Sequence, residues 1–268
     1  MSLEPEALDH YNMGMEDARL NEGSGLVEYL RTLEIIRRHL GTERSKILDV
    51  GGGTGPYAIA LAAEGHQVSL IDAAPIHIET LVKNPDSSLL QSFAVGNACS
   101  LAFQDHDFDL VLLLGPLYHL TDYKDRQSAL AEAMRVLRPG GVVIGAAVTK
   151  FASLLHGYLA NLIEDPVFKG IVARDLVDGQ HRNPSNNPRY FTTTKFHEPT
   201  EFKSEFEAAG FLEVQTYSVE SFTWMLGNLN GHLDRNTDEL LDHLRQIESE
   251  PSIQGISSHI LAVGQKPI

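Results

Sequence analysis

The most constraining feature of this chain is a glycine-rich segment that directly follows a short apolar run. Residues 46–55 read Lys-Ile-Leu-Asp-Val-Gly-Gly-Gly-Thr-Gly, and a helical pattern begins at Pro56. Ile47, Leu48 and Val50 give the kind of apolar run that a buried parallel strand needs, and the glycines allow the backbone to turn sharply and to approach a ligand closely. The sequence therefore predicts a strand, a tight turn and a helix, with a small molecule bound on the turn.

The acidic residues around this unit indicate which small molecule it binds. A second strand is predicted over residues 67–71, and it ends in Asp72. An acidic side chain at the carboxyl end of the second strand can accept both hydroxyls of a ribose. Asp49, on the first strand, is expected either to face the charged amino-acid end of the ligand or to hold the glycine turn through backbone amides. This pair of acids fits S-adenosylmethionine, which carries a ribose and an ammonium group but no phosphate.

These residues resemble the first motif of the class I S-adenosylmethionine-dependent methyltransferases, in which an acidic residue precedes G-x-G-x-G. Residues 108–115 resemble the fourth strand of that family and residues 136–144 the turn into its fifth strand, so the resemblance covers about residues 26–149. It implies an enzyme of the small-molecule type, which transfers the methyl group of S-adenosylmethionine to an oxygen, nitrogen or carbon atom of an unidentified acceptor. The cofactor contacts that it implies come from Asp49, Gly51, Gly52, Gly53, Gly55, Asp72, Ala73, Asn97, Ala98, Leu114 and Tyr11.

Two of these contacts, Asn97 and Tyr11, differ from the rest in residue type or in position. Asn97 stands where the family usually has an aspartate that reads the adenine amino group, and the carbonyl oxygen of asparagine can accept the same hydrogen bond. Tyr11 belongs to residues 1–24, which are expected to fold over the cofactor as a lid, as amino-terminal segments do in many members of the family. The alternative for this segment is a frayed amino-terminal helix.

Other functions are compatible with parts of the pattern. The sequence Gly53-x-Gly55-x-x-Ala58 also satisfies the dinucleotide fingerprint, in which the helix amino terminus binds a pyrophosphate, so an NAD-dependent oxidoreductase is one alternative. A non-catalytic protein that binds S-adenosylmethionine is another. A methyltransferase that acts on a macromolecule would need a basic groove.

Composition narrows these alternatives. The chain of 268 residues is 43% hydrophobic and carries a formal net charge of −15, which disfavours a nucleic-acid substrate because phosphate contacts require a basic surface. Cys99 is the only cysteine, so neither an intramolecular disulfide nor a thiolate metal cluster is expected, and no H-E-x-x-H metal motif occurs. The absence of a signal sequence or a membrane-spanning run indicates a cytoplasmic protein. The oligomeric state stays open, with a homodimer as one alternative.

The order of predicted elements specifies an α/β fold. Strands alternate with helices up to Thr149, which predicts a doubly wound, mostly parallel sheet of seven strands with an antiparallel last strand over residues 257–265. Residues 1–268 are expected to form a single methyltransferase domain of the Rossmann-like type. Residues 151–198 interrupt the alternation, and they are interpreted as an inserted helical cap over the substrate site.

Four residues are candidates for acid–base chemistry. Tyr118 and His119 follow the carboxyl end of the fourth strand, where ligands bind in open α/β sheets, and His119 is either a general base or a locally packed residue. His181 and His197 lie in the predicted cap, where each is either a pocket residue or a locally bonded loop residue. A base is needed only when the acceptor is a poor nucleophile, such as a hydroxyl or a protonated amine.

Overall fold

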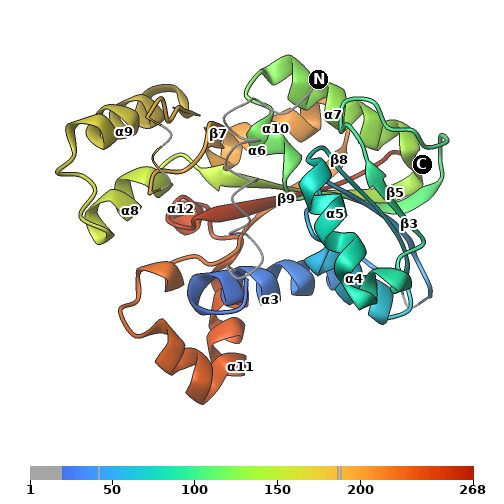
Figure 1. Cartoon of the computed structure of the whole chain (residues 1–268), viewed down its shortest axis with the longest axis horizontal. Coiled ribbons are helices and arrows are strands. Elements are labelled where there is room, and N and C mark those ends of the chain that lie inside the picture. Colours follow the sequence, from blue (N-terminus) through green and yellow to red (C-terminus); the bar gives the residue numbers. More distant parts are fainter. Residues whose placement is uncertain (1–19, 42, 186, 188) are drawn as a thin grey trace.

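The computed structural model describes residues 20–41, 43–185, 187 and 189–268, and Figure 1 shows a central sheet with helices on both of its faces. The strands are β1 Lys46–Val50, β2 Gln67–Asp72, β3 Ser92–Val95, β4 Phe108–Leu113, β5 Leu137–Thr149, β6 Gln180–His181, β7 Thr194–His197, β8 Leu212–Ser218 and β9 His259–Gln265. The helices are α3 Gly23–Arg38, α4 Pro56–Ala63, α5 Pro75–Lys83, α6 Pro116–His119, α7 Tyr123–Val136, α8 Ala152–Leu159, α9 Pro166–Asp178, α10 Pro199–Ala208, α11 Leu229–Ile247 and α12 Pro251–Gln254, with 3-10 helices η1 Pro85–Leu89 and η2 Thr223–Met225.

Among the described residues nine strands form one sheet, and seven of them follow the predicted arrangement. β3, β2, β1, β4 and β5 are parallel neighbours in that order, β9 follows β5, and β8 pairs with β9. β9 is antiparallel to both of its neighbours, with Ile144 opposite Val263. This arrangement confirms the predicted doubly wound sheet with an antiparallel last strand. Since the chain order reverses between β1 and β4, the carboxyl ends of these two strands open a crevice of the kind that binds ligands.

The alternation of side chains along β1 explains why its acid faces one particular layer of helices. Ile47 belongs to the apolar cluster beneath α3 and α4, whereas Leu48 belongs to the cluster beneath α7 and α10. Because successive side chains of a strand point to opposite faces, Asp49 lies on the same face as Ile47. The acid of the glycine motif therefore points toward α3 and α4.

Two strand boundaries depend on neighbouring segments. Residues 136–144 resemble a turn into the fifth strand, but β5 already begins at Leu137, because the segment around Pro139 is bonded to the end of β9. Gly140 N–H donates to the Lys266 carbonyl (3.1 Å), and Lys266 N–H donates to the Gly141 carbonyl (2.8 Å). The strand β3 is short, and it follows η1, which residues 85–89 form.

The predicted cap contains more than helices. Besides α8 and α9 it includes the short strands β6 and β7, which pair with each other within a segment that was expected to be a loop. β7 continues the sheet by pairing in parallel with the end of β5, where Val148 and Thr149 lie opposite Phe196 and His197. Figure 1 shows α8 and α9 side by side at one end of the molecule, away from α4 and α5.

None of the helices in the described part of the chain is both long enough and apolar enough to cross a membrane.

Candidate active site

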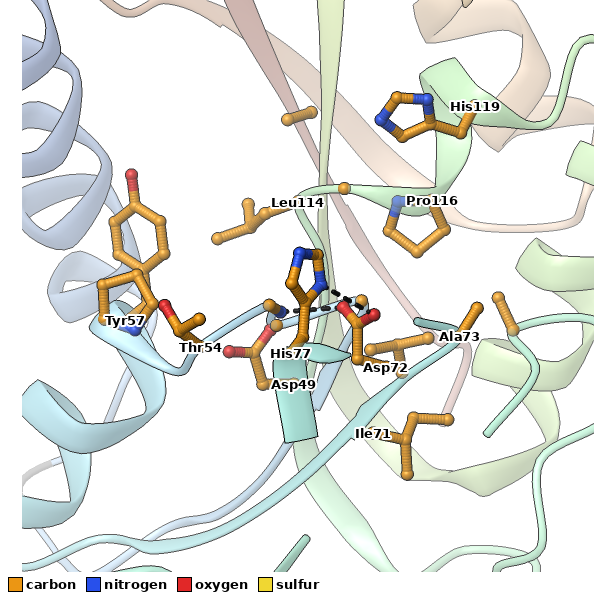
Figure 2. Close-up of a pocket in the computed structure, with 18 of the residues that line it drawn as sticks. Asp49, Thr54, Tyr57, Ile71, Asp72, Ala73, His77, Leu114, Pro116 and His119 are labelled. Carbon is orange, nitrogen blue, oxygen red and sulfur yellow. Dashed lines mark hydrogen bonds and ion pairs between the residues drawn. The ribbon is translucent and has the colours of Figure 1, made fainter. Parts of the chain in front are cut away.

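A cavity of about 1060 Å³ lies at the carboxyl ends of the parallel strands. Its walls come from α3, the glycine turn, the ends of β2 and β4, helix α6, and the start of β9. Figure 2 shows Asp49 and Asp72 close together beneath this space, with Leu114, Pro116 and His119 above them. Eleven of the residues predicted to be functional line the cavity, namely Asp49, Gly51, Gly52, Gly53, Asp72, Ala73, Asn97, Ala98, Leu114, Tyr118 and His119.

The glycine turn needs glycine for two separate reasons. Gly51, Gly53 and Gly55 have φ values of +71°, +58° and +88°, in the left-handed region that other L residues rarely adopt. At Gly52, a Cβ would lie 2.6 Å from Asp49 Oδ2, so that position tolerates no side chain. Gly55 does not line the cavity, and its role is to begin α4 as the residue that precedes Pro56. For Gly55 the structure shows this structural role, and the implied cofactor contact stays a proposal.

Asp49 is the most deeply buried acid of the site. The residue is 1% exposed, and neither carboxylate oxygen has a hydrogen-bond partner among the described residues. Burial, reinforced by the charge of Asp72, raises the pKa of this carboxyl from 3.8 to about 7. The structure therefore overturns the alternative that Asp49 holds the glycine turn through backbone amides. A nearby cation stabilises a buried carboxylate, so Asp49 fits the ammonium group of S-adenosylmethionine.

Asp72, by contrast, is already held by the protein. Its Oδ2 accepts a hydrogen bond from Gly53 N–H (2.8 Å), and its Oδ1 accepts from Ala74 N–H (2.8 Å) and from His77 Nδ1 (3.0 Å). A carboxylate offers about four acceptor positions, so a ribose hydroxyl must use the remaining one or displace one of these donors. His77 also lines the cavity. Sequence reasoning missed it, although its position in the first turn of α5, five residues after Asp72, was a usable signal.

Asn97 lines the cavity, but its carbonyl oxygen is already engaged. Asn97 Oδ1 accepts a hydrogen bond from Cys99 N–H (2.9 Å), which closes the turn after β3. A carbonyl oxygen has two lone pairs, so contact with an adenine amino group requires the second one. Ala98 forms the wall next to it.

Tyr118 and His119 stand where the topology predicts them. Both lie on α6, which directly follows β4, and both line the cavity. Their rings are in contact, with centroids 4.5 Å apart, and His119 is largely buried. Figure 2 shows the His119 ring above Pro116, on the opposite side of the cavity from Asp72. The structure therefore confirms their position, and a chemical role for either stays a proposal.

The two histidines of the cap do not line the cavity, which favours the second of their two alternatives, a locally bonded residue, over the first, a pocket residue. His181 is fully buried in the cap, where Nδ1 lies 2.8 Å from Asp175 Oδ2, Nε2 lies 3.2 Å from the Phe191 carbonyl and the ring stacks on Phe196. These contacts use both ring nitrogens and leave His181 a structural role.

His197 is buried on the other side of β7. It packs against Phe202 with ring centroids 5.1 Å apart, and its Nε2 lies 3.4 Å from Glu205 Oε1. Burial lowers the pKa of His197, so the ring is neutral at physiological pH. Glu205 is itself paired with the buried Arg126 (2.7 Å). The position of His197 therefore indicates a packing role.

Two segments were predicted to cover the site, residues 1–24 as a lid and residues 151–198 as a cap. Tyr11 and most of residues 1–24 lie outside the described residues, but Leu20, at the end of that segment, lines the cavity. No described residue of the cap lines it, but the cap contacts its wall: Gln180 Nε2 donates to the Thr121 carbonyl (3.1 Å), and Tyr118 packs against a cluster that includes Ala152 and Phe196.

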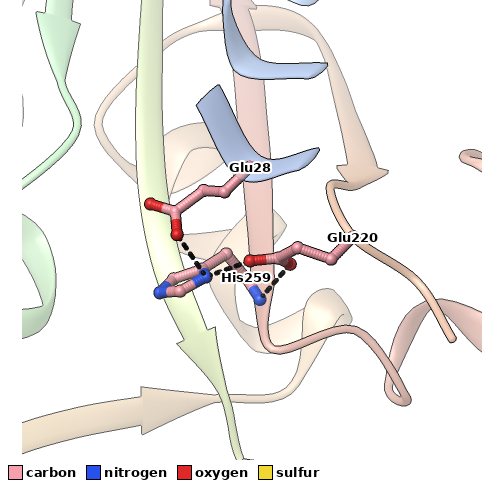
Figure 3. Close-up of side chains that lie close together, drawn as sticks. All are labelled: Glu28, Glu220 and His259. Carbon is pink, nitrogen blue, oxygen red and sulfur yellow. Dashed lines mark hydrogen bonds and ion pairs between the residues drawn. The ribbon is translucent and has the colours of Figure 1, made fainter. Parts of the chain in front are cut away.

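Sequence reasoning also missed a cluster at the far end of the cavity. Glu28 of α3, Glu220 after β8 and His259 of β9 meet there (Figure 3), and Glu28 and His259 line the cavity. These residues lie far apart in the sequence, so no spacing linked them. The only available signal was the antiparallel direction of β9, which brings its first residue to the edge where the parallel strands end.

Comparison with known proteins agrees with this site. Residues 47–141 match a family model described as a methyltransferase domain. Over 221 residues the chain is 28% identical to the demethylmenaquinone methyltransferase of Staphylococcus aureus, covering 79% of this chain and 86% of that protein. An S-adenosylmethionine-dependent methyltransferase from Methanosarcina mazei has the same fold, with a TM-score of 0.56, 20% identity and coverage of 87% of this chain and 97% of that one. A second one, from Thermotoga maritima, gives a TM-score of 0.58 at 18% identity, with coverage of 97% and 99%.

The sheet order, the glycine turn and the matched domain together define a Rossmann-like methyltransferase. The chain carries a methyltransferase domain, and its similarity to S-adenosylmethionine-dependent methyltransferases confirms the predicted activity and the predicted cofactor.

Proposed function

We propose that this enzyme methylates a small, planar, apolar acceptor that binds in the same cavity as the cofactor. The main support for the proposal is that a single cavity of about 1060 Å³ has a polar, acidic wall and an apolar wall. One wall offers Asp49, the open glycine turn and Asp72, and the other is lined by aromatic and aliphatic side chains.

The first wall suits S-adenosylmethionine. Asp49 would pair with the ammonium group, Asp72 would accept a ribose hydroxyl, and Asn97 with Ala98 would border the adenine. The space beside Gly53 is open as far as the described residues go, since none of their atoms lies within 4 Å of where its Cβ would be. When bound, the cofactor supplies an electrophilic methyl group on its sulfonium, so the protein mainly has to orient the acceptor in line with the breaking bond.

The second wall suits a ring system. Tyr29 and Tyr57 lie side by side with centroids 5.4 Å apart and planes tilted by 32°. Tyr118 adds a third aromatic side chain, and Val219 and Leu261 add aliphatic surface. Aromatic and aliphatic side chains are the usual lining of sites for apolar small molecules. The relative from Staphylococcus aureus acts on a quinone by its name, which agrees with such an acceptor.

The same geometry argues against a dinucleotide. A pyrophosphate on the glycine turn would lie near the buried acid Asp49, which would repel it whenever ionised. The first residue of α4 is Pro56, which has no N–H to offer to a phosphate.

Two measurements test the proposal. Calorimetry of the purified protein should show binding of S-adenosylmethionine and S-adenosylhomocysteine, and no binding of NAD. Mass spectrometry should then detect S-adenosylhomocysteine formed with a planar aromatic acceptor such as a hydroxynaphthoquinol, and less or none with a catechol, an aliphatic primary amine or transfer RNA. Binding of NAD alone would overturn the cofactor assignment, and turnover of the amine or the RNA alone would overturn the acceptor class.

We also propose that the acceptor is not a nucleic acid, that the protein is cytoplasmic, that it forms a homodimer, and that residues 151–198 close over the site. The acidic composition supports an acceptor other than nucleic acid. A cytoplasmic location and a homodimer rest on sequence expectations, and fractionation and light scattering would test them. A closing role for residues 151–198 is supported by their contacts with Thr121 and Tyr118 at the cavity wall.

A further inference from the structure

A histidine at the far end of the cavity is held by two acids. His259 Nδ1 lies 2.5 Å from Glu220 Oε1 and 3.5 Å from Glu28 Oε2 (Figure 3). Glu220 approaches from the segment after β8 and Glu28 from α3, so three separate elements converge on one imidazole. The side chain of His259 is 18% exposed and lines the cavity.

Glu220 is fixed more firmly than an ordinary surface acid. It is 1% exposed, and its Oε2 accepts hydrogen bonds from the backbone N–H of His259 (2.9 Å) and from Ser257 Oγ (3.1 Å). Burial alone favours the neutral acid, but the adjacent imidazole holds the pKa of Glu220 below its ordinary value. An ionised Glu220 accepts Nδ1–H, which selects one tautomer and directs the other ring nitrogen away from both acids, as Figure 3 shows.

The register of the sheet places this imidazole in the proposed acceptor half of the cavity. Val148 lies opposite His259, and two residues along the strands Ala146 lies opposite Leu261. Residues two apart on a strand share a face, so His259 projects to the same side as Leu261 and Ala146, which also line the cavity. The wall is thus continuous from the apolar acceptor surface to His259.

We infer that His259 is the proton acceptor for the methylated substrate and that Glu220 positions it, with Glu28 as a second carboxylate beside the ring. The inference rests on the proposed function. It narrows the acceptor class to planar molecules whose nucleophilic atom becomes available when a proton leaves, such as a phenolic hydroxyl or the ring carbon activated by it.

His259 and Glu220 account for the proton that methyl transfer releases. The acceptor gives its proton to Nε2 of His259, and the electron pair left on the acceptor makes the new bond to the methyl carbon. The carbon–sulfur bond breaks with its electrons remaining on sulfur, so one proton is released for each methyl group transferred. The carboxylate of Glu220 stabilises the imidazolium until the proton passes to solvent.

A first experiment needs no acceptor. Histidine side chains of the full-length protein are labelled with nitrogen-15, and the His259 signal is assigned as the one that is missing in His259→Gln. The Nδ1–H tautomer is expected in the neutral ring, and Glu220→Gln is expected to lower the pKa of His259 by about one unit or more, because the imidazolium loses a paired charge. An Nε2–H tautomer, or an unchanged pKa in Glu220→Gln, would overturn the inference.

A second experiment measures turnover with whichever of the three small probes is methylated. His259→Gln is expected to lower kcat by about 100-fold or more, with the Kd of S-adenosylmethionine changed by less than about threefold, since a general base typically contributes a factor of this size. Glu220→Gln should lower kcat and shift the pH at which it is half-maximal. The exposed His243→Gln on α11 is the matched control and should leave all three quantities unchanged.

The possible failures can be told apart. Wild-type protein that binds no S-adenosylmethionine would overturn the proposed function and this inference with it. Wild-type turnover that persists in His259→Gln would overturn the inference alone.

The ligand atoms of Glu28, Glu220 and His259 lie within 4.8 Å of one another, so Mg²⁺, Mn²⁺ and Zn²⁺ are titrated as well. Binding of one of these ions that is lost in Glu220→Gln, together with loss of activity in a chelator, would make the cluster a metal site instead.

Discussion

Replacing Asp49 with asparagine should stabilise the ligand-free protein at alkaline pH while weakening its binding of the cofactor. Asp49 has a raised pKa, of about 7 against an ordinary 3.8, because burial disfavours its charge. An acid with a raised pKa in the folded state contributes stability at low pH, and that contribution is lost as pH rises through about 4 and is gone above about 7. Asparagine carries no charge at any pH, so Asp49→Asn removes this dependence.

The size of the effect follows from the same shift. Between pH 5 and pH 8 the folded wild type loses about 3 kcal/mol through Asp49, at about 1.4 kcal/mol for each pH unit up to 7. The difference in free energy of unfolding between Asp49→Asn and wild type should therefore grow by about 3 kcal/mol in favour of the variant over this range. Urea denaturation of the ligand-free protein at both pH values measures it.

The matched control is Asp238→Asn on the exposed face of α11, which should show no such trend. Calorimetry with S-adenosylmethionine supplies the second readout. In wild type the affinity should fall by about fivefold between pH 7 and pH 6, because the ionised fraction of a carboxyl with a pKa of about 7 falls from about one half to about one tenth, and Asp49→Asn should bind weakly at both values. A variant with the same stability difference at pH 5 and pH 8, or with wild-type affinity for the cofactor, would refute this reasoning.

Three other substitutions test separate parts of the structure. Gly52→Ala should abolish cofactor binding with an intact fold, because the added Cβ would lie 2.6 Å from Asp49 Oδ2, and calorimetry with circular dichroism would show it. Asp72→Ala should weaken S-adenosylmethionine binding by about tenfold or more, and unchanged affinity would contradict the ribose assignment. Glu205→Gln should lower the free energy of unfolding at pH 7 by about 3 kcal/mol, because Arg126 is left buried without its carboxylate. Since the Arg126 and His197 contacts hold the pKa of Glu205 at about 2 despite its burial, that difference should shrink as pH falls from about 4.5 toward 2, and a constant difference would count against it.

Local patterns were enough to predict the cofactor half of the enzyme. The glycine turn, Asp49 and Asp72 lie within 27 consecutive residues, counted from Lys46, and the strand, turn and helix that carry them form through local interactions and the parallel pairing of β1 with β2. Few arrangements besides a ligand site combine glycines at positive φ with an acid at the end of the next strand, so the sequence indicates the role of these residues directly.

The positions of the histidines could be predicted only in part from such local patterns. His119 was placed correctly because the residue after a parallel strand must lie at the carboxyl edge of the sheet, whatever the neighbours are. His181 looked like a pocket residue in a polar loop, yet pairing of β6 with β7 folds that loop inward and buries the ring against Asp175 and Phe196. Whether His181 is buried depends on that pairing, and a strand of four residues gives only a weak pattern in the sequence.

The acid–base cluster is the opposite case, because its members have no sequence relation to one another. Glu28, Glu220 and His259 become neighbours only when α3 packs on the sheet and β9 enters between β5 and β8 in the antiparallel direction. The sequence by itself therefore determined the fold class and the cofactor, since both depend on short segments with strong conformational requirements. Only the tertiary structure decided which distant side chains face the acceptor, because long-range packing brings them together.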